Sequence, residues 1–66
     1  MQISLNGQEA DTRGARTVAE LIGRFGFSPE MILIEHNGVA LHRREWPQKS
    51  LTDGDQIEII RVVAGG

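Results

Sequence analysis

The sequence ends in two glycines, Gly65 and Gly66, and this pair has the clearest chemical use of any residues in the chain. Glycine has no Cβ, so a terminal pair can pass a narrow channel in another protein and adopt backbone angles that other residues avoid. A carboxylate is a poor electrophile, but ATP can convert it to an acyl-adenylate, from which a sulfur nucleophile can displace AMP. Taken alone, the pair is either a frayed chain end or a site at which Gly66 is activated and loaded, with Gly65 as the neighbour that gives it access. Its position directly after a strongly apolar segment favours the second interpretation.

Other chemistry finds little support in the sequence. Cysteine is absent, which excludes disulfides and thiolate metal sites. His36 and His42 are too few for a structural metal site. Neither has an acidic residue at a sequence spacing that would indicate a catalytic pair, and the sequence shows no nucleophile–base arrangement. The Asp53-Gly54-Asp55 segment predicts a plain turn, because a calcium loop needs several more ligands in register. We therefore expect a protein that is not an enzyme and binds no metal.

The composition is that of a small folded domain. A chain of 66 residues holds one domain with a thin core, and 39% apolar with 24% charged residues is far from a disordered composition. The net charge of −2 argues against a nucleic-acid partner. The sequence starts without a basic and apolar leader, and no apolar run approaches the roughly 20 residues that span a bilayer. We expect a cytoplasmic protein with no membrane contact.

Alternation and turn residues predict strands near both ends of the sequence. Residues 1–5 alternate apolar and polar side chains, Asn6-Gly7 is a hairpin turn signal, and residues 8–12 read as a solvated edge strand. Residues 31–35 and 39–41 form a second hairpin about Asn37-Gly38. Residues 42–50 are polar and predict a loop with at most one irregular turn. The last strand, residues 56–63, carries apolar side chains on both faces, as a central strand does.

One amphipathic helix is predicted between the two hairpins. Thr17 and Glu20 have the spacing of a capping box, and four apolar residues follow at helical intervals, namely Val18, Leu21, Ile22 and Phe25. Gly26 suits a left-handed C-terminal cap, with Phe27 packing back on the last turn. Gly23 lies inside this helix, and a close approach of helix to sheet would explain it.

The order of these elements predicts an α+β domain of the β-grasp, or ubiquitin-like, class. We expect a mixed sheet of about five strands, with the first and last strands side by side at its centre and one main helix packed on one face. The domain should span residues 1–63. Residues 64–66 should form a flexible C-terminal tail ending in Gly-Gly.

A few side chains are candidates for contact with a partner. Ile60 and Val62 lie on the face of the last strand away from the helix, where they form either a docking patch or a second small core. Arg61 is either a contact to an acidic partner surface or a solvated charge. Trp46 is more simply explained as a cover for one end of the core than as an anchor in an interface. Arg43-Arg44 is more simply explained as a solvated pair than as a cation–π stack on Trp46.

The whole chain resembles the ThiS family of sulfur carriers of thiamine biosynthesis. The resemblance rests on the β-grasp pattern, the length and the terminal Gly65-Gly66, together with residues 35–38, Trp46 and residues 51–55. Ala64 departs from the family, in which a third glycine is common, and a molybdopterin-synthase small subunit can also end in Val-Ala-Gly-Gly. That type of carrier, and a ubiquitin-like modifier or binding module, therefore stay open as alternatives.

The resemblance implies a definite reaction sequence at Gly66. In the family, an E1-like adenylyltransferase (ThiF type) uses ATP and magnesium to form an acyl-adenylate on the terminal glycine. Sulfur from a donor such as a cysteine desulfurase then gives a thiocarboxylate, and a thiazole synthase (ThiG type) accepts that sulfur. Carried over, Gly66 is the modified residue, while Gly65 and Ala64 are the tail that enters the partner's active site. The lack of cysteine agrees with cargo held on the carboxylate.

Overall fold

The protein's structure, a computed structural model, describes residues 1–62 and contains one five-stranded sheet. The strands are β1 (Gln2–Leu5), β2 (Gln8–Asp11), β3 (Ile32–His36), β4 (Val39–Leu41) and β5 (Gln56–Arg61). Their order across the sheet is β2-β1-β5-β3-β4, in which β1 and β5 are parallel and the other neighbours antiparallel. The predicted central position of the first and last strands is confirmed.

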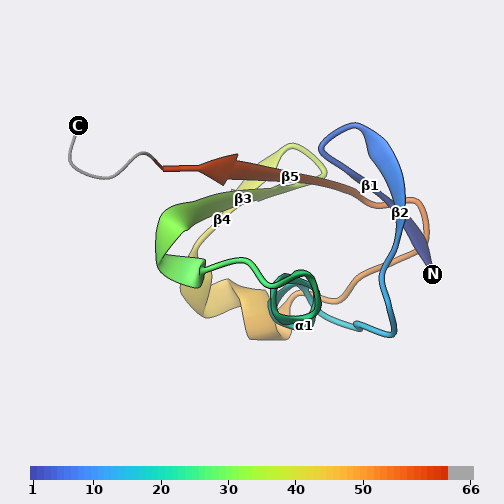
Figure 1. Cartoon of the computed structure of the whole chain (residues 1–66), viewed down its shortest axis with the longest axis horizontal. Helices are drawn as coiled ribbons and strands as arrows, with labels where there is room; N and C mark the ends of the chain where they lie inside the picture. The colour runs from blue at the N-terminus through green and yellow to red at the C-terminus, as the bar shows by residue number, and fades with distance from the viewer. Residues whose placement is uncertain (63–66) are drawn as a thin grey trace.

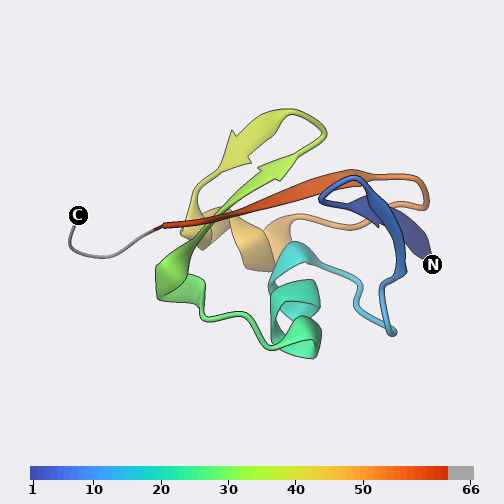
Figure 2. The same ribbon diagram turned by 45° about the horizontal axis from the view of Figure 1, so that its top comes forward.

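The helical elements all lie on one side of this sheet. They are α1 (Val18–Phe25) and two short 3-10 helices, η1 (Pro29–Met31) and η2 (Arg43–Gln48). Figures 1 and 2 show α1 and η2 beneath the sheet in both views, and no element of residues 1–62 lies over the opposite face. The arrangement is the predicted β-grasp fold, with a single main helix.

Both hairpins turn through an asparagine–glycine pair. Asn6 and Gly7 have φ of 51° and 82°, and Asn37 and Gly38 have 51° and 84°, the left-handed values that a two-residue hairpin turn requires. The asparagine side chains also hold the central strand: Asn6 Oδ1 accepts from the Ile59 amide at 2.7 Å, and Asn37 Oδ1 accepts from the Gln56 amide at 2.8 Å. The two turns therefore fix β5 from both of its edges.

The helix begins and ends as its sequence predicts. The Glu20 amide donates to Thr17 Oγ1 at 3.1 Å, while the Glu20 carboxylate accepts from the Arg16 amide at 2.8 Å, one residue before the predicted partner. At the other end Gly26 has φ of 74°, and the Phe27 amide donates to the Ile22 carbonyl. The explanation expected for Gly23 is wrong, because a Cβ built there meets no described atom within 4 Å.

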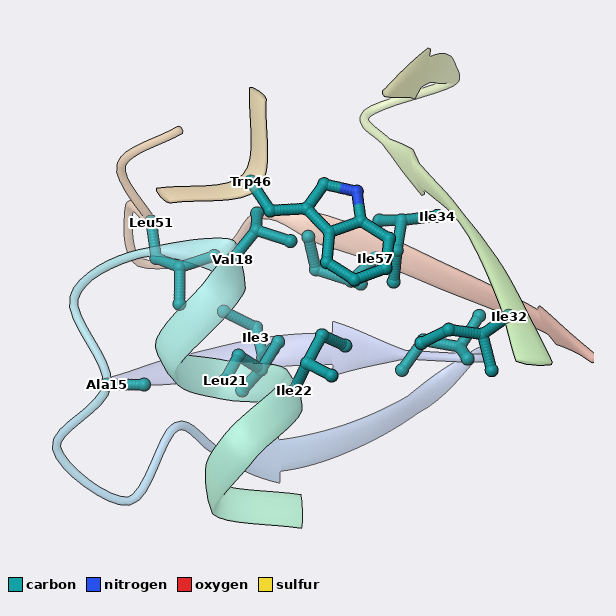
Figure 3. Close-up of a cluster of buried hydrophobic side chains, with 11 residues drawn as sticks. Ile3, Ala15, Val18, Leu21, Ile22, Ile32, Ile34, Trp46, Leu51 and Ile57 are labelled. Atoms are coloured by element: carbon teal, nitrogen blue, oxygen red, sulfur yellow. The ribbon is translucent and has the colours of Figure 1, made fainter. Parts of the chain in front are cut away.

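The core lies between α1 and the inner face of the sheet (Figure 3). Val18, Leu21 and Ile22 of the helix pack against apolar side chains of β1, β3 and β5, and Trp46 of η2 closes one end. The prediction that Trp46 covers the core is confirmed, since only 4% of it is exposed. The cation–π contact found within residues 1–62 is Arg13 over Phe25, at 4.2 Å, and does not involve Trp46.

Candidate functional site

The residues predicted to carry the chemistry follow directly on the central strand. Ala64, Gly65 and Gly66 lie outside the described residues, as does the predicted domain boundary at residue 63. The last described residue, Val62, donates its amide to the Met31 carbonyl at 2.8 Å. Because β1 pairs only with the start of β5, at Gln56 and Ile57, the end of β5 extends past β1 (Figure 1). The strand thus leads from the middle of the sheet to the tail.

Four apolar side chains are exposed near the end of β5. Leu33 of β3 lies directly opposite Ile60 of β5 in the sheet register, and the Val62–Met31 hydrogen bond continues the same register. The exposed fractions are 57% for Leu33, 45% for Ile60, 43% for Met31 and 42% for Val62. These four residues are called the apolar strip below. The alternative of a second small core under Ile60 and Val62 is therefore wrong.

Alternation along the strands explains why the strip is exposed. Ile57 and Ile59 of β5 point toward α1 and are buried, so Glu58 and Ile60 between and beyond them point away from it. The sequence reasoning found Ile60 and Val62 in this way. It missed Leu33 and Met31. These two residues lie beside Ile60 and Val62 only because β3 pairs with β5, and the sequence does not show that pairing.

Arg61 points to the other side of the sheet. It lies opposite Ile32 in the register and is exposed, and it lines a hollow of about 240 Å³ with Phe27, Ser28 and two residues of the apolar strip, Met31 and Val62. Within residues 1–62 it has no ion pair, since the ion pair present there joins His36 and Asp55. Arg61 therefore does not share a face with Ile60, although the two are adjacent in sequence.

A polar network that the sequence reasoning missed lies at the start of β5. The expectation that His36 has no acidic partner is wrong: Nε2 of His36 lies 2.8 Å from Oδ2 of Asp55. A carboxylate only accepts, so the histidine donates. Asp55 also accepts from the Thr52 amide at 2.9 Å and from Asn37 Nδ2 at 3.2 Å. These bonds join the β3–β4 turn to the turn that precedes β5.

The hydrogen bonds also decide the charge state of Asp55. Burial by itself raises the pKa of this carboxyl, but the bonds from His36, Thr52 and Asn37 outweigh burial and hold the pKa below its usual value. Asp55 is thus an anion whose acceptor positions are used within the fold. The network consequently holds the fold together at the start of β5.

Residues 1–62 contain no group of three or more side chains that could hold a metal ion. No helix among them is both long and apolar enough to cross a membrane.

Comparisons with known proteins agree on one family. A sequence profile described as the ThiS family matches residues 3–66. The chain is 33% identical to the sulfur carrier protein ThiS of Escherichia coli over 66 residues, which is the whole of both chains. It superposes with a TM-score of 0.83 on the crystal structure of the thiamine biosynthesis protein ThiS from Geobacter metallireducens, at 29% identity and with both chains fully covered.

A different kind of relative matches the chain as one part of a larger protein. The thiazole synthase of Magnetococcus marinus is 32% identical over all 66 residues, and the chain spans 20% of the length of that protein. The thiazole synthase of Paramagnetospirillum magneticum is covered to the same extent, at 29% identity. Given the match over residues 3–66 and the full-length likeness in sequence and structure, the chain belongs to the ThiS family, as the resemblance predicted.

Proposed function

We propose that this chain carries sulfur for thiamine biosynthesis on the carboxylate of Gly66. The observation that supports this most directly is the match to the E. coli sulfur carrier over every residue of both chains, Gly66 included. In this role the chain is a co-substrate and not a catalyst. Within residues 1–62 the one ion pair joins His36 and Asp55, and its hydrogen bonds hold the turn that precedes β5.

The reaction begins with the Gly66 carboxylate as a nucleophile. A carboxylate oxygen attacks the α-phosphorus of ATP, pyrophosphate leaves, and an acyl-adenylate forms. A sulfur nucleophile supplied by a donor such as a cysteine desulfurase then attacks the acyl carbon and AMP leaves. The attack of a desulfurase persulfide gives an acyl disulfide, and a second thiol cleaves its S–S bond, which releases the thiocarboxylate and leaves a disulfide on the donor. ATP and magnesium are bound by the partner adenylyltransferase (ThiF type), so this chain supplies only the acyl group and the surface that presents it.

The sheet holds in place the strand that precedes the tail. β5 pairs with β1 at its start and with β3 up to Arg61, so the chain is held by the sheet almost to Val62. The four residues after Val62 reach about 14 Å at full extension. A partner that binds the end of the sheet must therefore place its active site within this reach of Val62.

The proposed acceptor of the sulfur is a thiazole synthase (ThiG type). Two thiazole synthases each contain a segment that is similar to this whole chain, which supports carrier and synthase acting together. The adenylyltransferase and the sulfur donor are proposed from the chemistry of Gly66. This small chain must therefore meet three proteins in turn: the adenylyltransferase, the sulfur donor and the thiazole synthase.

The test follows the mass of the intact chain. Incubation with ATP, a ThiF-type adenylyltransferase and a sulfur donor should increase the mass by the difference between sulfur and oxygen, and alkylation should trap the product. Deletion of Gly66 should abolish this gain, with the melting temperature unchanged. A wild-type chain that stays unmodified, or one that becomes joined to lysines of other proteins, would refute the proposal. Sulfur delivered to a pterin precursor, and not to thiazole formation, would refute the pathway.

A further inference from the structure

A hollow of about 410 Å³ lies between α1 and η2, and its wall is largely apolar. The two elements pack side by side under the sheet (Figures 1 and 2). In the wall, α1 contributes Ala19 and Gly23, η2 contributes Trp46 and Pro47, and the connector after α1 contributes Phe27. Protein pockets that bind ligands have volumes of roughly 300–1,000 Å³. The hollow is therefore large enough to hold a large side chain of another protein.

Gly23, in the wall of this hollow, has no packing reason inside the described part of the chain. Glycine in the interior of a helix is less stable than alanine, and a Cβ built at Gly23 meets no described atom within 4 Å. Ala19 lies four residues earlier, on the same face of α1, and lines the same hollow. Two such small residues let another segment approach the helix backbone closely. Contact with a partner at this face explains Gly23, which packing within residues 1–62 does not.

Arg43 is the one charged residue in the wall of the hollow as residues 1–62 form it. Its side chain is exposed, and the one ion pair of the described chain joins His36 and Asp55, so Arg43 has no acidic partner there. A guanidinium makes strong, charge-assisted hydrogen bonds with a carboxylate. The occupant that complements the hollow is therefore an apolar side chain with a carboxylate beside it.

We infer that this hollow is a docking site for the thiazole synthase, filled by an apolar side chain of that enzyme whose neighbouring carboxylate pairs with Arg43. This inference rests on the proposed function. Of the three proposed partners, the thiazole synthase is the one that the comparisons support. Two such enzymes contain a segment similar to this whole chain, the residues around the hollow included.

The position of the hollow suits a partner that also takes the tail. Phe27 lines this hollow and also the smaller one beside Arg61 and Val62, where the described chain ends. An enzyme seated against α1 and η2 therefore also reaches the point from which the tail starts. Such a contact holds the carrier while Gly66 is in the active site, without using the tail itself.

The test fills the hollow from within. Gly23→Leu places a side chain in the space that the occupant needs, so it should weaken binding of the thiazole synthase about tenfold, with Gly23→Ala intermediate. Neither variant should lower the melting temperature, because alanine and leucine both favour a helix more than glycine does. In thiazole formation the KM for the loaded carrier should rise while kcat stays unchanged, since Gly66 and its tail are intact.

Arg43→Gln tests the carboxylate of the occupant. It should weaken binding of the synthase about threefold and leave an affinity that depends less on salt. The matched control is Arg44→Gln, because Arg44 is the next residue of η2, is exposed and does not line the hollow. This control should bind the synthase with the affinity and salt dependence of the wild type.

Several outcomes would overturn the inference. Unchanged binding of the synthase by Gly23→Leu would show that the hollow is not a docking site, and equal losses in Arg43→Gln and Arg44→Gln would refute the paired carboxylate. A loss confined to the adenylyltransferase, or a wild-type dimer that Gly23→Leu abolishes, would show that the occupant is wrong. The mass gain of the wild type with ATP separates this inference from the proposed function. A wild type that never gains sulfur refutes the proposed function, whereas one that loads while Gly23→Leu binds normally refutes only the docking site.

Discussion

Replacing Asp55 by alanine should destabilise the fold although no apolar contact of the core is removed. The carboxylate accepts from His36 Nε2, the Thr52 amide and Asn37 Nδ2, at 2.8, 2.9 and 3.2 Å. Hydrogen bonds to a charged group are worth about 1.5–3 kcal/mol each when buried, and less here, since Thr52 and Asn37 are exposed. Counting about 1 kcal/mol for each bond, we expect a loss of about 3 kcal/mol.

That loss is large for so small a domain. A chain of this length has a free energy of unfolding of about 3–10 kcal/mol. A change of 1 kcal/mol moves the melting temperature of such a domain by about 4–8 °C, so the Asp55→Ala variant should melt about 12–24 °C below the wild type. Asp53→Ala is the matched control, because Asp53 lies in the same turn and accepts a single bond, from the Gln2 amide at 2.9 Å.

The contribution of Asp55 should also depend on pH. Its pKa in the folded protein is below the usual value, because the bonds from His36, Thr52 and Asn37 outweigh the opposing effect of burial. A group with a depressed folded pKa stabilises the fold fully above its unfolded pKa of about 3.9, and this contribution is lost as the pH falls through the folded pKa. The difference in stability between wild type and Asp55→Asn should therefore shrink on acidification below about pH 4.

Trp46 provides the assay, since it is the one tryptophan in the chain and is buried. Its fluorescence during urea unfolding, together with circular dichroism on heating, measures the free energy of unfolding of each variant. A loss of less than about 1 kcal/mol in Asp55→Ala, or no difference from Asp53→Ala, would refute the account of the network. A wild-type advantage over Asp55→Asn that persisted unchanged at low pH would refute the pKa argument.

Two further substitutions test the helix and the closing of the core. Gly23→Ala should raise the free energy of unfolding by about 1 kcal/mol, because the added methyl group meets no described atom within 4 Å and alanine favours a helix; a lower melting temperature would contradict this. Trp46→Ala should lower the free energy of unfolding by about 3–5 kcal/mol, because it empties one end of the core. In that case circular dichroism must report unfolding, and a loss below 1 kcal/mol would show that Trp46 does not hold the core.

Much of the fold could be predicted because its signals are local. The turn at Asn37-Gly38 follows from two adjacent residues that tolerate positive φ, and the start of α1 follows from Thr17 and Glu20, three residues apart. The alternation in β5 likewise separates Ile59, which is buried, from Ile60, which is exposed. Backbone sterics, capping and the two-residue period of a strand act over a few residues, so the sequence alone carries them.

What the sequence could not show were the pairs of residues that are distant in the chain. His36 meets Asp55 across 19 residues, Leu33 stands beside Ile60, and Glu35 faces Glu58, because β3 and β5 are antiparallel neighbours in one particular register. The register of two strands that are distant in the chain depends on which side chains of both are buried together against α1, and no turn between them fixes it. The sequence by itself therefore determined the elements, the ThiS resemblance and Gly66 as the candidate site of chemistry. Only the tertiary structure decided which side chains share the surface beside the tail.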